Sequence, residues 1–172
     1  MIKTERLLLR EWRDDDLPLI AAINADPLAM RHFVAPFTRE QSDASIARYR
    51  ASQAERGFCM WAVELPGVAP VIGVLGLAHN NFEPPYLAGI EIGWRFGPAY
   101  WGKGYATEGA KAALRFGFEQ KGLEEILSMT VPANEPSWRV MERIGMTRDP
   151  PAISITRACP MATASSATSS TA

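Results

Sequence analysis

The stretch Ala99–Leu114, AYWGKGYATEGAKAAL, decides how the rest of the chain is interpreted. Gly102 and Gly104 flank a lysine, and small and apolar residues then recur at helical spacing. A glycine turn that leads into a helix presents unpaired backbone N–H groups at the positive end of the helix dipole. Such a turn attracts phosphate groups, and its glycines let an anion approach without a Cβ in the way. Several classes of nucleotide-binding protein use this arrangement.

Two of those classes do not fit the neighbouring residues. Gly97, Gly102 and Lys103 satisfy the G-x-x-x-x-G-K pattern of a triphosphatase loop, but Gly104 stands where a Ser or Thr should hold the magnesium ion. Gly102 and Gly104 also begin the G-x-G-x-x-G pattern of a dinucleotide loop, but Thr107 stands in the place of the third glycine. A tight turn without any ligand is the remaining simple alternative.

The bulk composition indicates one ordinary globular domain. The 172 residues are 47% hydrophobic and 22% charged, with a formal net charge of −1, so no basic excess points to nucleic acid. Two cysteines are too few for a disulfide framework, and His32 and His79 lack metal-ligand spacing. No apolar run suits a signal peptide or a membrane span. We therefore expect a cytoplasmic monomer or homodimer with no metal and no nucleic-acid or membrane partner.

The pattern along the chain predicts a mixed α/β (α+β) fold. We expect strands at 5–12, 58–65, 71–79, 89–96 and 126–131, and helices at 13–27, 37–57, 104–120 and 132–146. Thr38 and Gln41 have capping-box spacing, and Gly57 stands where the second helix should stop. The order combines an early antiparallel meander with one late crossover helix.

The segment from Trp101 to Ala106 resembles the acyl-CoA pyrophosphate loop of the GNAT N-acetyltransferase superfamily, which is written Q/R-x-x-G-x-G/A. Gly104, Tyr105 and Ala106 match its last three positions. Trp101 replaces the Gln or Arg, and in this it is similar to the ribosomal-protein (RimJ/RimL-type) N-acetyltransferase branch. The resemblance implies that the glycine turn holds a coenzyme rather than a nucleotide triphosphate.

Two further motifs carry the same resemblance. The opening TERLLLR at Thr4–Arg10 is similar to the first strand of that branch. The later N-x-x-S-x-x-V-x-E-x-x-G pattern is met by Asn134, Ser137, Val140, Glu142 and Gly145. The resemblance spans Thr4 to Met146 and implies a central, mostly antiparallel twisted sheet flanked by helices.

The family resemblance implies acetyl-CoA as co-substrate, bound in a V-shaped opening between the strands at 89–96 and 126–131. Backbone groups of the first strand would pair with pantetheine, the glycine turn would hold the pyrophosphate, and the asparagine would contact the coenzyme arm. The implied coenzyme-binding residues are Trp94, Arg95, Phe96, Trp101, Gly102, Lys103, Gly104, Tyr105, Ala106, Thr107 and Asn134.

In the implied reaction an amine attacks the thioester directly, without an acyl-enzyme. Glu91 is our candidate to take the amine's proton, with a structural or substrate-orienting carboxylate as the alternative. Ser137 is the candidate to protonate the sulfur, with helix capping as the alternative. A backbone N–H at Ile92 or Gly93 would stabilise the oxyanion.

The acceptor stays open between a protein N-terminal α-amine and a small amine. A peptide α-amine, with a pKa of about 8, already has a useful neutral fraction near neutral pH. A second functional class is also open: an acyl-CoA-binding protein with little or no catalysis. Turnover with a panel of amines separates these two classes.

The composition changes after Asp149, which divides the chain into a GNAT domain at 1–149 and an atypical Ala/Ser/Thr-rich tail at 150–172. We interpret the tail as translated in a shifted reading frame. Back-translation from Ala152 with GC-rich codons, read from the third base, gives DLDHPRLPDGHRLVRHVLYR, which resembles the family's ending. Ile153 and Ile155 alternate as in a short strand. The tail otherwise predicts an atypical or missing C-terminal strand pair, and a missing pair would leave an unpaired edge on the strand at 126–131.

Overall fold

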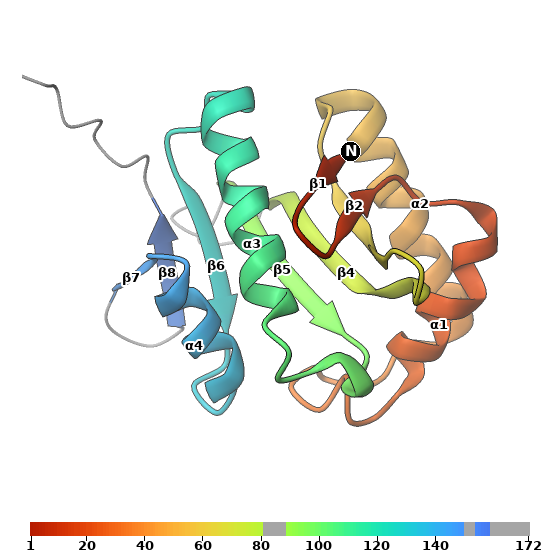
Figure 1. The fold of residues 1–172 in the computed structure, drawn as a ribbon. Helices are drawn as coiled ribbons and strands as arrows, with labels where there is room; N and C mark the ends of the chain where they lie inside the picture. Colours follow the sequence, from red (N-terminus) through yellow and green to blue (C-terminus); the bar gives the residue numbers. More distant parts are fainter. Residues whose placement is uncertain (81–88, 150–153, 159–172) are drawn as a thin grey trace, which may run out of the picture.

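A twisted sheet of eight strands runs through the computed structural model, which describes residues 1–80, 89–149 and 154–158 (Figure 1). In spatial order the strands are β1 (Ile2–Lys3), β2 (Leu8–Arg10), β3 (Met60–Leu65), β4 (Ala69–Asn80), β5 (Gly89–Phe96), β6 (Ile126–Thr130), β8 (Ser154–Ala158) and β7 (Thr147–Asp149). Neighbouring strands are antiparallel except for β5 and β6, which are parallel. The mixed α/β class predicted from the sequence is confirmed.

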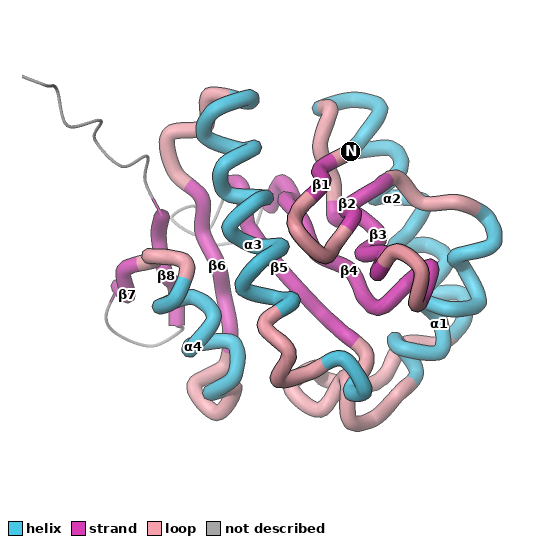
Figure 2. The backbone as a smooth tube through the Cα atoms, in the orientation of Figure 1, coloured by secondary structure: helices cyan, strands magenta, loops and turns pink. Residues whose placement is uncertain are grey.

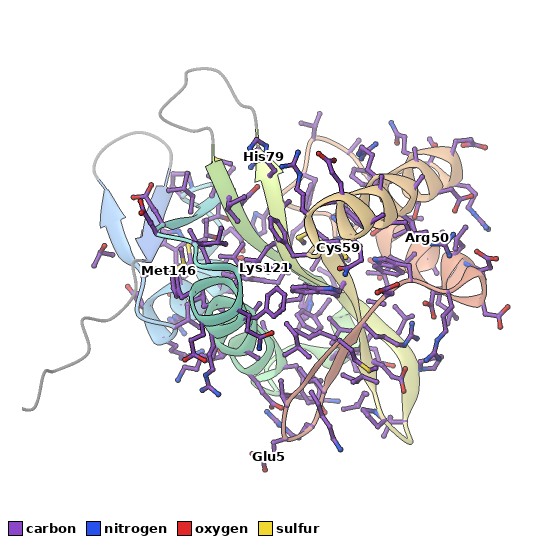
Figure 3. The ribbon with its side chains drawn as sticks, turned by 90° about the horizontal axis from the view of Figure 1, so that it is seen from above. Glu5, Arg50, Cys59, His79, Lys121 and Met146 are labelled. Atoms are coloured by element: carbon purple, nitrogen blue, oxygen red, sulfur yellow. The ribbon has the colours of Figure 1, made fainter. Side chains whose placement is uncertain are left out.

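Helices cover both faces of the sheet. The helices are α1 (Leu17–Ala25), α2 (Arg39–Arg56), α3 (Tyr105–Arg115), which continues as a π-helical turn over Phe116–Gln120, and α4 (Glu135–Arg143); short 3-10 turns span Asp14–Asp16 and Pro98–Tyr100. Ile20 of α1 and Ile46 of α2 pack with Val74 of β4, whereas Ala110 of α3 packs with Leu75 on the other face. Figures 2 and 3 show α2 and α3 on opposite sides of the strands.

The predicted boundaries of α2 are confirmed by its caps. Thr38 and Gln41 form a capping box, in which the Gln41 N–H donates to the Thr38 hydroxyl at 3.2 Å and the Thr38 N–H donates to the Gln41 side chain at 2.9 Å. The helix ends at Gly57, whose φ of 73° is left-handed. A polar sequence therefore forms a long helix because both of its ends are specified locally.

The α3 helix lies close against the sheet because its inner face is built from small residues. A Cβ on Gly109 would come within 2.9 Å of Leu75 Cδ1, and one on Gly117 within 2.8 Å of Ile126 Cδ1. The predicted small-residue face is confirmed, although it also includes Gly109, and Ala106 is only half-buried. This close packing fixes the start of α3 relative to β5.

The parallel strands β5 and β6 separate toward their carboxyl ends. Within the described chain they pair at Glu91 and Leu127, and they diverge from there toward Phe96 and Thr130 (Figure 1). This is the V-shaped opening that the family resemblance implies. The divergence leaves one edge of β5 open to a ligand.

The outer edge of β6 is paired, so of the two predicted alternatives for the C-terminal strand pair the missing pair is wrong, as is the unpaired edge that would follow from it. The strand β8 pairs antiparallel with β6 from Ile126–Ala158 to Thr130–Ser154, and β7 pairs with β8 in turn. An open edge presents a row of N–H and C=O groups, and the alternating segment Ser154–Ala158 has the period of a strand that can satisfy them. Ile153 and the rest of the tail at 150–152 and 159–172 lie outside the described residues.

Candidate active site

A cavity of about 590 Å³ lies between the glycine turn, α4 and the segment that precedes α2. All predicted coenzyme-binding residues except Lys103 line it, and Ser137 lines it as well. The Lys103 ammonium instead lies 5.8 Å from the centre of the Tyr100 ring. The structure therefore brings together three segments that are far apart in the sequence.

The glycine turn directs backbone N–H groups toward this cavity. Gly104 is the N-cap of α3, and no side chain caps the helix there. The first N–H groups of a helix have no partner within it, and Tyr105, Ala106 and Thr107 carry those groups here and line the cavity. Their position at the positive end of the helix dipole suits an anion.

The glycines of the turn are required by backbone conformation more than by space. Gly102 and Gly104 have φ values of 72° and 81°, in the left-handed region that other residues avoid. A Cβ on Gly102 would meet nothing within 4 Å, and one on Gly104 would come 3.4 Å from Arg6 Nη2. The turn can therefore form only if both positions tolerate positive φ.

The N-terminal segment before β2 clamps the glycine turn. The Thr4 hydroxyl donates to Glu108 Oε1 at 2.6 Å, and the Arg6 N–H donates to the same oxygen at 2.8 Å. The Arg6 guanidinium donates to Glu108 Oε2 at 2.7 Å and to the Lys103 carbonyl at 3.0 Å. It also lies 4.8 Å from the centre of the Tyr105 ring. The opening motif thus holds the first turn of α3.

Trp101 links the glycine turn to the end of β5. Its indole N–H donates to the Phe96 carbonyl at 2.8 Å, and the Arg31 guanidinium lies 4.8 Å from the centre of its ring. The Trp side chain thus fixes the turn where the family pattern has Gln or Arg. It also supports an arginine at the cavity.

The sequence analysis predicted Arg95 at this cavity but missed three other arginines. Arg31, Arg139 and Arg143 all line it. Arg139 and Arg143 are four residues apart on α4, so they share one face of the helix; this spacing was the available signal. Guanidinium groups bind phosphate oxygens through paired hydrogen bonds. The arginines that line the cavity therefore come from the segment after α1, from β5 and from α4, whereas Lys103 does not line it.

A second cavity, of about 1030 Å³, lies on the α2 side of the gap between β5 and β6. It is walled by α2, by the end of β4 and by β6. The residues that line both cavities are His32, Phe33, Trp94, Arg95, Asn134 and Ser137. Molecules bound in the two cavities can therefore meet at the gap.

Glu91 lies where β5 and β6 begin to separate, and it lines the second cavity. Burial raises the pKa of its carboxyl group above the usual value, and hydrogen bonds from the Asn80 amide and the Met129 N–H offset only part of that rise. A carboxylate with a raised pKa is a stronger base than an exposed one. Its position and basicity both suit proton removal from a molecule in the second cavity.

Ser137 and Asn134 meet Trp94 at the junction of the cavities. The Trp94 indole N–H donates to the Ser137 hydroxyl at 3.3 Å, and the Asn134 amide donates to the Thr130 hydroxyl at 3.0 Å. The N-cap of α4 is Asn134, so Ser137 lies inside the helix and the capping alternative is wrong. Its hydroxyl is placed at the gap instead.

The two candidate oxyanion donors are consecutive residues of β5, so their side-chain positions face opposite sides of the sheet. Gly93 lines the second cavity, and a Cβ there would contact Met60 Cε at 3.3 Å. Ile92 is fully buried in the core that packs against α3. That either backbone N–H stabilises an oxyanion stays a prediction.

Comparison with known proteins agrees with this geometry. The acetyltransferase (GNAT) domain family model matches residues 6–147. An N-acetyltransferase of Bacillus subtilis, YnaD, is 35% identical over 149 residues, which cover 86% of this chain and 83% of that protein. The FsC-acetyl coenzyme A-N(2)-transacetylase of Aspergillus fumigatus is 44% identical over 151 residues, covering 85% of this chain and 64% of that protein.

Solved structures share the fold over nearly the whole chain. An acetyltransferase of Agrobacterium tumefaciens superimposes with a TM-score of 0.81 at 28% identity, covering 91% of this chain and 92% of that one. At lower identity the likeness is one of fold. A ribosomal-protein-serine acetyltransferase of Vibrio cholerae has a TM-score of 0.72 at 21% identity over 92% and 97% of the two chains. The spermidine N-acetyltransferase of Vibrio cholerae, solved with CoA and spermine, has a TM-score of 0.71 at 19% identity over 90% and 95%.

A split sheet with an anion-attracting turn on one side and a basic carboxylate on the other defines an acyl-transfer site. The chain belongs to the GNAT acetyltransferase family, and it is an acyl-CoA-dependent acetyltransferase. Among the described residues, no group of three His, Cys, Asp or Glu side chains could hold a metal ion. Within the same part of the chain, no helix has the length and apolar character that a membrane span needs.

Proposed function

We propose that the protein transfers the acetyl group of acetyl-CoA to a primary amine that binds in the second cavity. The observation that carries this proposal is the meeting of the two cavities at the gap between β5 and β6, with Glu91 on the acceptor side. The names of two similar proteins, an N(2)-transacetylase and a spermidine N-acetyltransferase, also point to amine acceptors.

In this proposal the coenzyme lies in the first cavity. The N–H groups of Tyr105, Ala106 and Thr107 would bind the pyrophosphate, and the arginines of the cavity would surround the phosphate oxygens. The open edge of β5 from Trp94 to Phe96 would pair with pantetheine as an added strand. Asn134 would contact the same arm near the gap.

The chemistry then follows from the groups around the gap. Glu91 takes a proton from the ammonium form of the acceptor, and the neutral amine attacks the thioester carbonyl. A backbone N–H at Ile92 or Gly93 stabilises the tetrahedral oxyanion. The C–S bond breaks as the oxyanion collapses, the Ser137 hydroxyl gives its proton to the departing sulfur, and the serine oxygen takes up the proton that the nitrogen loses as it becomes an amide. The products are an acetamide and CoA as its thiol.

The acceptor in this proposal is a protein N-terminal α-amine or a small amine. The similarity to the ribosomal-protein branch supports the first, and the open second cavity is large enough for either. An α-amine with a pKa of about 8 needs little help from Glu91, whereas a lysine-type amine near 10.4 needs more.

Calorimetry with acetyl-CoA tests the coenzyme site. The variant Gly104→Val should lose measurable affinity, because a branched residue cannot hold the left-handed conformation that aims the N–H groups. The matched control is Gly122→Val, which carries the same backbone strain at φ 63°, has nothing within 4 Å of its Cβ and lies outside both cavities. Equal affinity in the two variants would contradict the assignment of the turn.

Release of CoA thiol with a panel of amines and peptides tests the reaction. We expect acetylated product from at least one amine class in step with thiol release. A protein that binds acetyl-CoA and acetylates none of them would instead support a binding role.

A further inference from the structure

Arg95 is a half-buried cation whose guanidinium lacks a full set of partners. Its Nε and Nη2 atoms are shielded from solvent and, among the described residues, have no hydrogen-bond partner. Its guanidinium lies 5.3 Å and 5.4 Å from the ring centres of Phe33 and Phe37, and it interacts with the Tyr49 side chain. Aromatic faces attract a cation but do not satisfy its N–H groups.

The same chain shows how it treats a buried arginine that only stabilises the fold. Arg10 is 3% exposed, and its guanidinium is paired with Asp16 at 2.6 Å and with Glu64 at 2.5 Å. It also donates to the Pro70 carbonyl at 2.8 Å. Leaving a buried charge unpaired is costly, so the contrast indicates that Arg95 is completed by a group from outside the chain.

Two of the three segments outside the described residues are attached to the sheet far from Arg95. The loop at 81–88 joins Asn80 to Gly89, which pair with each other six residues up β5 from Arg95, or about 20 Å at the rise of a strand. Residue 159 follows Ala158, which pairs with Ile126 on that same side of the Glu91–Leu127 pair. The third segment, 150–153, has the sequence PPAI and contains no charged side chain.

Arg95 shares its face of β5 with Glu91 and Gly93, because side chains two residues apart point to the same side of a sheet. The Cα atoms of Glu91 and Arg95 are about 13 Å apart along the strand, and both side chains line the second cavity. Gly93 stands between them, and the end of the Met60 side chain packs against it. The acceptor cavity thus has a proton acceptor at one end and a cation at the other.

We propose that Arg95 binds a carboxylate of the acceptor, so that the preferred acceptors are amines with a carboxylate a few bonds away. The inference rests on the function proposed above and narrows its substrate class. Free amino acids and peptides with an acidic first residue share this chemistry, whereas polyamines lack it and would place a cation against Arg95. A guanidinium binds a carboxylate with two parallel hydrogen bonds, which matches the two N–H-bearing atoms that lack partners.

The test compares acceptors in pairs that differ only by a carboxylate or a carboxamide. The free pairs are glycine with glycinamide, β-alanine with β-alaninamide and 4-aminobutyrate with its amide. The peptide pair is a tripeptide that begins with aspartate and one that begins with asparagine. Rates are expressed per neutral amine. In whichever set matches the natural acceptor, the free amines or the peptides, we expect kcat/KM to be roughly 10- to 100-fold higher for the carboxylate member of a pair than for its carboxamide.

Substitution of the arginine separates its role from reactivity of the amines themselves. In Arg95→Met the carboxylate preference should disappear, so that kcat/KM for each carboxylate acceptor falls to the value for its carboxamide partner. The control Arg115→Met removes an exposed arginine of α3 outside both cavities and should keep the preference. Arg95→Gln is the second variant if the methionine variant does not fold, and the wild-type ratios decide alone if neither does.

The outcomes are distinct. Equal kcat/KM for both members of every pair in the wild type, or an undiminished carboxylate preference in Arg95→Met, would overturn the assignment of Arg95 to the acceptor. Absence of thiol release with every amine would instead mean that the proposed transfer reaction itself is wrong.

Discussion

The carboxylate of Glu91 is held in an environment that favours its protonated form. Burial raises its pKa, and this rise is only partly offset by the Asn80 amide and the Met129 N–H. The Glu91→Gln variant should lower kcat/KM roughly 100- to 10,000-fold, the usual contribution of a general base. In the wild type kcat/KM should fall as the pH drops through this raised pKa, and that acidic limb should vanish in the variant. Steady-state kinetics across pH measures both effects.

The same group should make the fold less stable when it is ionised. Its pKa is higher in the folded chain than in the unfolded one, so its contribution to stability is present at acidic pH and is lost as the pH rises through the folded value. At neutral and alkaline pH the Glu91→Gln variant should therefore melt at a higher temperature than the wild type. The exposed Glu119→Gln serves as control. Equal melting temperatures for Glu91→Gln and wild type at alkaline pH would contradict this reading of the site.

For single residues, the sequence predicts a role that depends on backbone conformation better than it predicts which charged side chains reach the site. Gly104 could be predicted because only a few residue types tolerate a helix start at positive φ. The cations of the first cavity could not be predicted in this way. Lys103 lies within the glycine turn in sequence but its ammonium lies near the Tyr100 ring, whereas Arg143 lines the cavity because of how α4 packs. Whether the Arg95 guanidinium has hydrogen-bond partners depends on which distant residues the fold brings next to it, so no local sequence pattern could predict it.

Among the elements, the segment before β2 acts on the coenzyme site through α3. We expect Arg6→Met to raise the Kd for acetyl-CoA about tenfold, because it removes the hydrogen bonds to Glu108 and to the Lys103 carbonyl that hold the turn. The melting temperature should change little, since the guanidinium is half-exposed and such ion pairs add little to stability. Calorimetry and thermal unfolding measure the two quantities.

A matched control is Arg39→Met, which breaks an exposed ion pair with Asp43 on α2, away from both cavities. It should leave the Kd for acetyl-CoA unchanged. If Arg6→Met also leaves the Kd unchanged, the clamp does not position the glycine turn.

The predicted elements were most accurate where local chemistry specifies both ends. The capping box of Thr38 and Gln41 and the left-handed Gly57 fixed α2 within the sequence itself. The strand β8 was missed as a partner of β6 because a short alternating segment becomes a strand only beside an open edge. That information lies in the tertiary structure.

For the whole molecule, the tail makes one definite contribution. We propose that residues 1–149 form the catalytic domain and that the atypical tail at 150–172 completes its sheet through β8. A chain that ends after Asp149 should unfold at a lower temperature or self-associate, because it exposes the edge of β6. A chain that ends after Ala158 should match the full chain. Thermal unfolding and light scattering compare the three.

Equal stability of both truncated chains would show that β8 contributes nothing to the sheet. The reading-frame hypothesis is separate and depends on the codons. Gene sequence from codon 152 onward that cannot encode the family-like ending in the shifted frame would exclude it.

The gap between β5 and β6 also separates the binding site proposed for the coenzyme from the one proposed for the acceptor. In the proposed reaction the coenzyme and the acceptor bind in different cavities, one at the starts of α3 and α4 and the other beside α2, which share only the residues at the junction. Under this proposal either molecule can bind while the other is present, and the two products can leave independently. The sheet therefore separates the two binding sites as well as supporting them. The product CoA should compete with acetyl-CoA for the first cavity and leave the acceptor cavity accessible.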